Sequence, residues 1–260
     1  MNRGQEWRTR QTAPTSSVRW IGAADATALT QAACQRILAA AARAIAERAR
    51  FVIVLAGGDT PRGVYQSLRT AHTHWSRWHV YFGDERCLPA NDVERNSRMA
   101  ADAWLDHVPI PMDQIHAIPG ELGPDAAALA YAQVLRNVDD FDLVLLGLGA
   151  DGHTASLFPG HSWGEAPGAG DTLAIFDAPK PPPRRVSLSG ARLSRAREVL
   201  FLIAGACKRD AVARWRAGEK LPPDAIRPVG GCDVLVDSAL LSPDAPADIR
   251  NAGRSTIGRQ

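Results

Sequence analysis

The stretch FDLVLLGLGADGHTASLFPG, residues 141–160, decides the fold because an apolar run leads there into a glycine-rich turn. Such a run, bounded by glycines, is typical of a strand buried inside a parallel sheet. The turn that follows carries Asp151 and His153. Ligands of open α/β sheets bind at the carboxyl ends of strands, and histidine titrates nearest neutral pH. The stretch therefore predicts a catalytic turn after a central strand.

Strand-like and helix-like segments alternate along the rest of the chain. We predict helices over 23–50, 60–68, 96–107, 124–137 and 207–217, and strands over 51–58, 79–86 with its terminal loop, 115–120, 141–149, 172–178, 184–189, 198–205 and 232–237. The Gly- and Pro-rich segment 160–183 is expected to form a long surface loop around one of these strands. This alternation predicts an α/β fold with a mostly parallel sheet and helices on both faces.

Domain organisation is expected to be simple, because the chain shows neither an internal repeat nor a linker. We expect one domain over residues 18–250. The polar N-terminal segment, 1–17, and the C-terminal tail, 251–260, are expected to be frayed.

The composition excludes several classes of function. Thirty basic and 28 acidic residues give a net charge of +2, so a nucleic acid is not expected as a partner. The four cysteines are far apart and form no CxxC pair, which argues against a zinc knuckle and favours reduced thiols in the cytoplasm. The chain has no signal-peptide pattern and no apolar window of about 18 residues, so a membrane partner is not expected either.

The loop Ala56-Gly57-Gly58-Asp59-Thr60-Pro61 is a candidate anion site. Its glycines let the backbone approach a ligand, and the free N–H groups at the start of the next helix attract negative charge. The loop lacks the lysine of a nucleotide P-loop. Alternatively, it is a tight turn in which Asp59 or Thr60 caps the helix.

Two further loops follow strands. Gly83-Asp84-Glu85-Arg86 places two carboxylates beside a guanidinium, a set that can orient hydroxyl groups and an oxyanion, although such charges are also common in solvated loops. In the third loop, Asp151 and His153 can converge on one ligand, or the carboxylate can orient the imidazole.

Two basic residues are expected at the same edge of the sheet. Lys208 follows a strand and opens a helix, and Arg185 begins a strand. Either residue alone is more often a surface charge. Together with the three loops, they predict a site for a small anion.

One glycine motif resembles a dinucleotide-binding turn but lacks the structural context of such a turn. Gly147–Gly152 matches the GxGxxG pattern of dinucleotide-binding turns, and Asp171 lies near the distance of a ribose-binding acid. That pattern requires a helix and a second strand within about 30 residues, whereas Pro159-Gly160 ends any helix soon after the turn. A nicotinamide cofactor is therefore not expected. His72 and His74 lack a third nearby ligand and predict no metal site.

Five segments together resemble a known family. They are VLAGGDTPRGVYQSL (54–68), VYFGDERCLPANDVERNSRM (80–99), FDLVLLGLGADGHTASLFPG (141–160), APKPPPRRVSLS (178–189) and AGACKRDAV (204–212). In this order they resemble the signature blocks of the 6-phosphogluconolactonase family, part of the larger glucosamine-6-phosphate isomerase/phosphogluconolactonase group. The resemblance implies a modified Rossmann-like fold and hydrolysis of 6-phospho-D-glucono-1,5-lactone in the cytoplasm, without a cofactor.

The resemblance also implies roles for individual residues. It places the catalytic histidine at His153, the site arginine at Arg86, and phosphate-handling residues at Gly57–Thr60, Arg185 and Lys208. The chain departs from the family at Ala56, where many relatives have serine, and at Asp59, where small or basic residues are common. Phosphate binding by backbone N–H groups survives both changes. A sugar phosphate is the expected partner, and the protein is expected to be a monomer or a homodimer.

From these residues we expect a hydrolytic mechanism. His153 takes a proton from water, Asp151 orients the imidazole and Arg86 stabilises the developing oxyanion. Lys208 and Arg185 hold the distant phosphate, which positions the carbonyl. Asp84 and Glu85 are expected beside the substrate, with their separate roles left open.

Two alternatives stay open at this point. An aminosugar-phosphate isomerase/deaminase shares the Asp-Gly-His turn, but its chemistry resembles one needing a further acid where this chain has Phe158, which cannot transfer a proton. A sugar-phosphate sensor without turnover would usually carry a DNA-binding domain, and the N-terminus shows no helix-turn-helix pattern.

Overall fold

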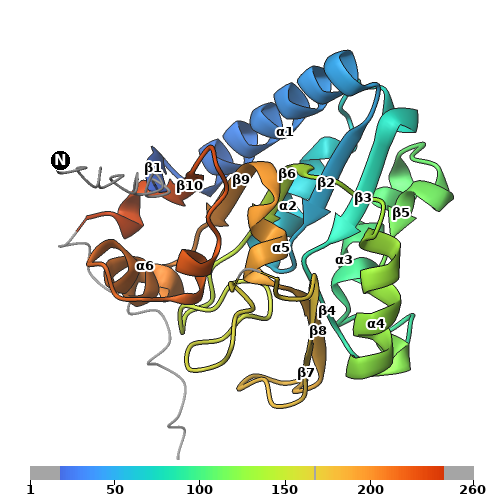
Figure 1. Cartoon of the computed structure of the whole chain (residues 1–260). Coiled ribbons are helices and arrows are strands. Elements are labelled where there is room, and N and C mark those ends of the chain that lie inside the picture. The colour runs from blue at the N-terminus through green and yellow to red at the C-terminus, as the bar shows by residue number, and fades with distance from the viewer. Residues whose placement is uncertain (1–17, 167, 243–260) are drawn as a thin grey trace, which may run out of the picture.

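The computed structural model describes residues 18–166 and 168–242 and confirms the α/β fold with a mostly parallel sheet. Seven strands form the main sheet, and every neighbouring pair is parallel. Their spatial order is β1 (Val18–Ala23), β10 (Cys232–Asp237), β9 (Ala196–Ile203), β6 (Phe141–Leu146), β2 (Phe51–Leu55), β3 (Trp78–Phe82) and β5 (Ile115–His116). Figure 1 shows the sheet crossing the molecule from β1 to β5.

The central strands are buried because their residues are almost all apolar. Every residue of β2 and of β6 is buried. Strands covered on both faces need such continuous apolar runs, since neither face meets water. The stretch 141–146 therefore forms a strand near the middle of the sheet, between β9 and β2.

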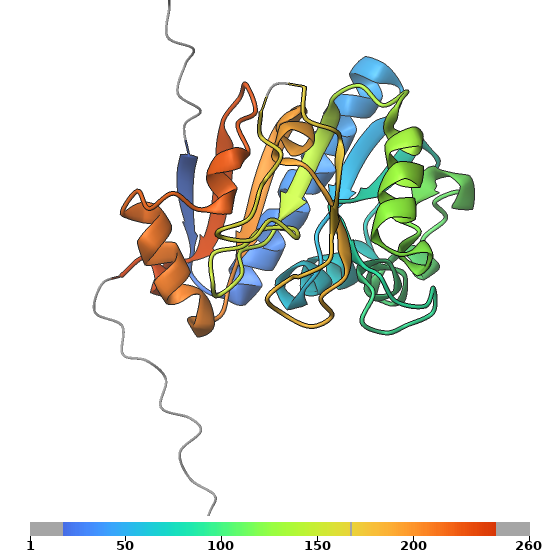
Figure 2. The same cartoon turned by 60° about the horizontal axis from the view of Figure 1, so that its bottom comes forward.

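Helices cover both faces of the sheet. One face carries α1 (Ala26–Arg48), α2 (Asp59–Leu68) and α3 (Asn96–Ala103). The opposite face carries α4 (Pro124–Leu135) and α5 (Gly190–Ser194), which lie in front of the sheet in Figure 2. The Arg192 guanidinium of α5 lies 3.9 Å from the centroid of the Phe141 ring of β6. The last helix, α6 (Arg209–Arg216), lies beside β1 and β10 in Figure 1.

A second, antiparallel sheet was not predicted. It contains β4 (Asp84–Arg86), β8 (Arg185–Leu188) and β7 (Thr172–Ile175), in the order β4-β8-β7. The chain passes from β3 through Gly83 directly into β4. The loop expected over 83–86 is therefore a strand, because β8, far along the chain, supplies its hydrogen-bonding partners.

Other differences concern element ends. The strand β1 was not predicted, and α1 begins after it, where the Asp25 carboxylate accepts a hydrogen bond from the Ala28 N–H at 2.8 Å. The helix expected over 96–107 ends at Ala103 and is followed by a short 3-10 turn, Leu105–His107. The predicted segments 1–17 and 251–260, and the expected domain end at 250, lie outside the described residues.

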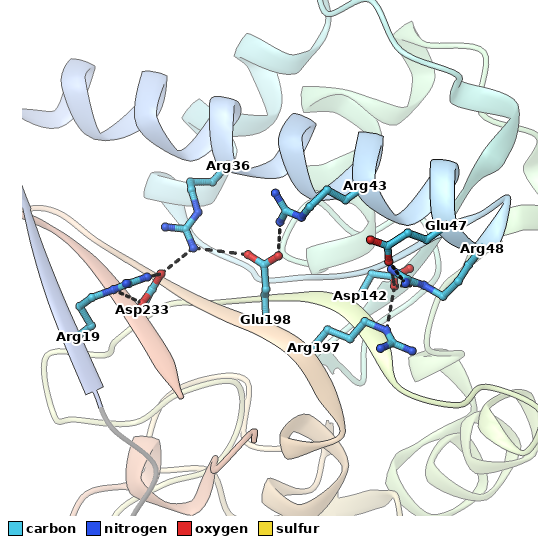
Figure 3. A network of polar contacts seen from close by, with 9 residues as sticks. All are labelled: Arg19, Arg36, Arg43, Glu47, Arg48, Asp142, Arg197, Glu198 and Asp233. Atoms are coloured by element: carbon cyan, nitrogen blue, oxygen red, sulfur yellow. Dashed lines mark hydrogen bonds and ion pairs between the residues drawn. The ribbon is translucent and has the colours of Figure 1, made fainter. Parts of the chain in front are cut away.

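Ion pairs tie α1 to the amino-terminal parts of the strands (Figure 3). Glu198 of β9 contacts Arg36 at 3.5 Å and also contacts Arg43, and both arginines lie on α1. Asp233 of β10 contacts Arg36 and Arg19, each at 2.6 Å. These carboxylates stand between α1 and the sheet and hold the two together.

Asp142, near the start of β6, is a second anchor in the same network (Figure 3). Its carboxylate accepts a hydrogen bond from the Val52 N–H at 2.8 Å and contacts Arg48 at 2.9 Å and Arg197 at 3.5 Å. Its side chain is only 6% exposed, so these partners replace the water that it has lost.

Two sequence expectations concern sulfur and membranes. The four cysteines are free thiols, as the sequence predicts. Among the described residues, no helix is both long enough and apolar enough to cross a membrane.

Candidate active site

Most of the predicted site residues line one cleft at the carboxyl ends of the central strands. The cleft has a volume of about 160 Å³. It lies where β2, β3 and β6 end and where the chain turns from β9 into α6. The predicted residues that line it are Gly57, Gly58, Asp84, Arg86, His153, Arg185 and Lys208.

Two buried tyrosines fix the strand ends at the cleft. The Tyr65 hydroxyl accepts a hydrogen bond from the Ala56 N–H at 3.0 Å and donates to the Ala56 carbonyl at 2.8 Å. The Tyr131 hydroxyl accepts from the Phe82 N–H at 2.9 Å and donates to the Phe82 carbonyl at 3.2 Å. Burial raises the pKa of both hydroxyls, so they stay protonated and keep both contacts.

The glycine loop after β2 lines the cleft with backbone atoms, at Gly57 and Gly58. A Cβ at Gly57 would collide with the Asn96 side-chain amide, so only glycine fits there. The residue that precedes α2 is Gly58, with φ 104° and no side-chain cap. The cap expected from Asp59 or Thr60 is therefore wrong. The Asp59 side chain is 93% exposed and pairs with Arg62 at 3.2 Å, and neither Asp59 nor Thr60 lines the cleft.

The two carboxylates of β4, on Asp84 and Glu85, accept hydrogen bonds from other parts of the chain. Both Asp84 oxygens are occupied, one by the Asn96 side-chain amide at 2.9 Å and one by the Ser156 hydroxyl at 2.6 Å. Glu85 is fully buried, and its oxygens accept from the N–H groups of Asn96 at 2.6 Å and Ser97 at 2.8 Å. Glu85 thus caps α3 and does not line the cleft, in contrast to the predicted position beside the substrate. Successive residues of a strand point to opposite faces, which separates these two carboxylates.

Arg86 and Arg185 lie opposite each other across the β4–β8 ladder, and both line the cleft. Arg86 donates to the Glu94 carbonyl, and its buried Nε has no hydrogen-bond partner in the described part of the chain. Arg185 is 4% exposed and donates to the carbonyls of Pro182 at 3.0 Å and Lys180 at 3.1 Å. Burial lowers the pKa of Arg185, but an arginine remains charged in a protein. Two guanidinium groups on one wall attract an anion.

Asp151 and His153 form a direct pair in the turn after β6. One Asp151 carboxylate oxygen, Oδ1, lies 2.5 Å from Nδ1 of His153. A Cβ at Gly149 would collide with both side chains, so this glycine makes room for the pair. Burial favours the neutral carboxyl, but the hydrogen bond and charge of His153, together with Lys180, hold the pKa of Asp151 well below its ordinary value.

The ionised carboxylate fixes the imidazole tautomer. Because a carboxylate can only accept, Nδ1 of His153 carries a proton, so that in the neutral imidazole the lone pair lies on Nε2. Next along the turn, Ala155 lines the cleft with φ 47°, a left-handed conformation that is uncommon outside glycine. The Phe158 ring lies 4.9 Å from the imidazole and closes one side of the pair. The arrangement is that of a base held by an orienting carboxylate.

Sequence reasoning missed three residues at the site. The Lys180 Nζ lies 3.3 Å from the Asp151 carboxylate. Asn96 and Ser156 hold Asp84 from α3 and from the turn after β6. Each contact joins segments that are far apart in the chain, so no local pattern identified them.

The residues that resemble a dinucleotide site or a metal site form neither among the described residues. No helix follows Gly147–Gly152, where a bridge between Thr154 and Leu157 stands instead. Asp171 contacts Arg192 at 3.6 Å and Arg195 at 3.5 Å. Across residues 18–166 and 168–242, no three metal-ligating side chains gather, so His72 and His74 complete no metal site.

Comparisons with known proteins agree with this geometry. Residues 24–235 match the family described as glucosamine-6-phosphate isomerases/6-phosphogluconolactonase. A 6-phosphogluconolactonase of Mycobacterium tuberculosis is 42% identical over 203 residues, which cover 73% of this chain and 82% of that protein. One from Mycobacterium leprae is 37% identical over 239 residues, with 86% and 96% covered. The solved structure of a 6-phosphogluconolactonase from Thermotoga maritima superimposes with a TM-score of 0.78 at 26% identity and covers 85% of this chain and 100% of its own.

Proposed function

This chain belongs to the glucosamine-6-phosphate isomerase/6-phosphogluconolactonase family, and from that premise we propose that it hydrolyses 6-phospho-D-glucono-1,5-lactone to 6-phospho-D-gluconate. This is the second step of the oxidative pentose phosphate pathway. The observation that carries the proposal is the Asp151–His153 pair, at 2.5 Å, at the edge of a cleft that Arg86, Arg185 and Lys208 also line. A histidine base can activate water for attack on an ester, and three cationic side chains can bind the negatively charged phosphate of the substrate and stabilise the oxyanion that forms.

His153 is the general base in the proposed mechanism. Its Nε2 takes a proton from water as the water oxygen attacks the lactone carbonyl. Asp151 stabilises the imidazolium that forms. When the tetrahedral intermediate collapses, the bond between the carbonyl carbon and the ring oxygen breaks, and the imidazolium returns its proton to that oxygen. The sum is one water consumed and one carboxylic acid formed, which ionises in water.

Arg86 stabilises the oxyanion of the intermediate. Its side chain lines the cleft, and its buried Nε has no protein partner within residues 18–166 and 168–242. A donor held in place before the reaction costs no reorganisation when charge develops. Asp84 takes no proton in this scheme, and its two oxygens accept hydrogen bonds from Asn96 and Ser156.

In the proposed mechanism the phosphate binds at the Lys208 and Arg185 side chains, which both line the cleft. Lys208 supplies a charge there, and within the described residues it makes no ion pair. Arg185 adds a second charge, and Gly57 and Gly58 let the backbone approach the phosphate oxygens. Holding the distant phosphate positions the carbonyl for attack and raises kcat/KM.

The isomerase/deaminase alternative is disfavoured at Phe158. This side chain is 1% exposed, and its ring lies 4.9 Å from the His153 imidazole and 5.6 Å from the Arg185 guanidinium. It occupies the place where ring-opening chemistry would need a further acid, and it has no proton to transfer. The site therefore supports hydrolysis better than aminosugar isomerisation.

We propose further that the protein works in the cytoplasm as a monomer or a homodimer. A sugar phosphate is its partner, without a nucleic acid or a membrane. Each step above uses only water and side chains of this chain, so the proposed mechanism needs no cofactor.

A coupled assay tests the proposed function. Freshly generated 6-phosphogluconolactone is supplied, and 6-phosphogluconate is measured above the spontaneous background. Glucosamine 6-phosphate serves as the control substrate. Turnover of the lactone alone supports the proposal, turnover of glucosamine 6-phosphate favours the isomerase/deaminase, and tight binding of 6-phosphogluconate without any turnover favours a sensor.

A further inference from the structure

One oxygen of Asp151 serves two cations. Oδ1 lies 2.5 Å from Nδ1 of His153 and 3.3 Å from Nζ of Lys180. Lys180 comes from the long loop before β8, far from the turn that carries the pair. Its side chain is 43% exposed, so the ammonium reaches Asp151 from the solvent side.

Lys180 is fixed by its backbone. Arg185 donates through Nη2 to the carbonyls of Lys180, at 3.1 Å, and Pro181, at 3.2 Å, and through Nε to that of Pro182, at 3.0 Å. Because Arg185 is 4% exposed and lies in β8, the loop is tied to a rigid element. The lysine is therefore held close to Asp151.

A histidine that is paired only with a carboxylate is protonated more easily, and this limits its use as a general base. The negative charge stabilises the imidazolium, and a protonated imidazole cannot take a proton from water. A second cation on the same oxygen opposes that effect. Protonation of His153 would place two positive groups around a single carboxylate, which costs electrostatic free energy.

Other charged groups lie near the pair, but among the described residues none of them contacts the Asp151 carboxylate. Arg214 of α6 donates to the Asp151 backbone carbonyl at 3.3 Å and forms an ion pair with Glu219. Arg185 bonds loop carbonyls, Asp84 bonds Asn96 and Ser156, and Arg86 and Lys208 line the cleft. The His161 ring lies 6.0 Å from the Phe158 ring, and its Nδ1 lies 3.8 Å from the Asp177 carboxylate. Within the described chain, Lys180 is the only basic side chain other than His153 that contacts the Asp151 carboxylate.

We infer that Lys180 is a positioning residue that keeps His153 in its neutral, proton-accepting form by sharing the Asp151 carboxylate. The inference rests on the proposed function, in which His153 is the general base. Lys180 acts through Asp151 and makes no contact with the reacting atoms in this scheme. It differs in this respect from Lys208, which is proposed to bind the phosphate.

The pH dependence of kcat/KM tests this role. In Lys180→Met, the acid limb of the profile is expected to move to higher pH by about 0.5 to 1 unit, because the carboxylate then stabilises the imidazolium alone. Lys180→Arg keeps the charge and should restore the wild-type limb. Lys220→Met is the matched control, since it removes the same charge from a lysine that lies over the Trp163 ring. A rise in KM with an unmoved acid limb would overturn the inference and make Lys180 a substrate anchor.

A second measurement does not depend on turnover. The His153 ring resonance, assigned by its loss in His153→Gln, is titrated by NMR in the wild type and in Lys180→Met without substrate. Its midpoint is expected to move upward in Lys180→Met and to stay in place in Lys220→Met. An unmoved midpoint in Lys180→Met would refute the role, provided that its Tm equals that of the wild type; if Tm falls, the same comparison is made with Lys180→Gln. A moved midpoint in a protein without lactonase activity would support the pairing and refute the proposed function.

Discussion

At the amino-terminal parts of the strands, every arginine in the network of Figure 3 contacts a carboxylate, whereas Arg86 and Arg185 at the carboxyl ends bond to backbone carbonyls. In the first region Asp142, Glu198 and Asp233 form ion pairs with these arginines. In the second region no carboxylate forms an ion pair with these two arginines within the described residues, since Glu85 caps α3 and Asp84 bonds Asn96 and Ser156.

The difference teaches how one residue type serves two purposes in one molecule. An arginine beside a carboxylate is neutralised and fastens two elements together. An arginine that bonds only carbonyl dipoles keeps its net charge for a ligand. Changes at the two ends should therefore affect different properties, activity at one end and stability at the other.

The largest expected effect concerns two histidines, one from each region. His153→Gln should lower kcat/KM by about 10²- to 10⁴-fold, the range of a positioned base. His79→Gln, in β3 near its amino end, should leave kcat/KM unchanged. Both variants are assayed on fresh lactone with the spontaneous rate subtracted. A wild-type rate in His153→Gln would remove the histidine from the mechanism.

A pair of arginines gives the next largest effect. Arg86→Gln should lower kcat/KM by about 10²-fold, as the loss of one oxyanion donor does, and should leave Tm unchanged. Arg36→Gln should do the reverse, because its ion pairs with Glu198 and Asp233 join α1 to the sheet. Steady-state kinetics and thermal unfolding are measured on both. The division between an active end and a stabilising end is wrong if Arg36→Gln lowers kcat/KM and leaves Tm unchanged.

Asp142→Ala should be the most destabilising change in the network. It leaves the buried Val52 N–H without its acceptor and leaves Arg48 and Arg197 without this partner. The expected loss is about 2–3 kcal/mol of unfolding free energy, or about 4–12 °C in Tm. Asp142→Asn keeps an acceptor and should lose less. An unchanged Tm in Asp142→Ala would show that these contacts contribute nothing.

The smallest effect is a pH dependence at Asp233. Burial favours its neutral form, but hydrogen bonds from Arg19 and Arg36 outweigh this and hold the pKa of Asp233 below its ordinary value. A carboxylate with a lowered folded-state pKa stabilises the fold above the unfolded pKa, about 3.9, and this contribution is lost as pH falls below it. Tm of Asp233→Asn should lie no more than about 4 °C below that of the wild type near pH 6. The gap should close toward pH 3, and a constant gap would contradict the pKa assignment.

Sequence patterns identified every strand of the main sheet except β1, and most clearly its central strands β2 and β6, because these are continuous, fully buried runs. The turn after β6 and the loop after β2 were both expected at the sheet's carboxyl edge, and Gly57, Gly58 and His153 do line one cleft there. Parallel strands bring such turns together whatever their separation in the chain. This part of the site follows from topology alone.

The parts that were missed depend on contacts between distant segments. The segment 83–86 is too short and too charged to suggest a strand, and only its pairing with β8 makes it one. Once it is a strand, its alternation sends Asp84 and Arg86 to the cleft and Glu85 into α3. Lys180 lies in the segment 178–189 that resembles the family, but its contact with Asp151 depends on the course of the whole loop before β8.

The β4–β8 ladder also has a consequence for the order in which the molecule assembles. Its two strands are separated by about 100 residues of chain, so the loop between them must close before Arg86 meets Arg185. During synthesis from the N-terminus, a nascent chain that ends before β8 has one half of this cationic wall and not the other. If the cleft binds an anion as proposed, that anion stabilises the completed fold and not its precursors.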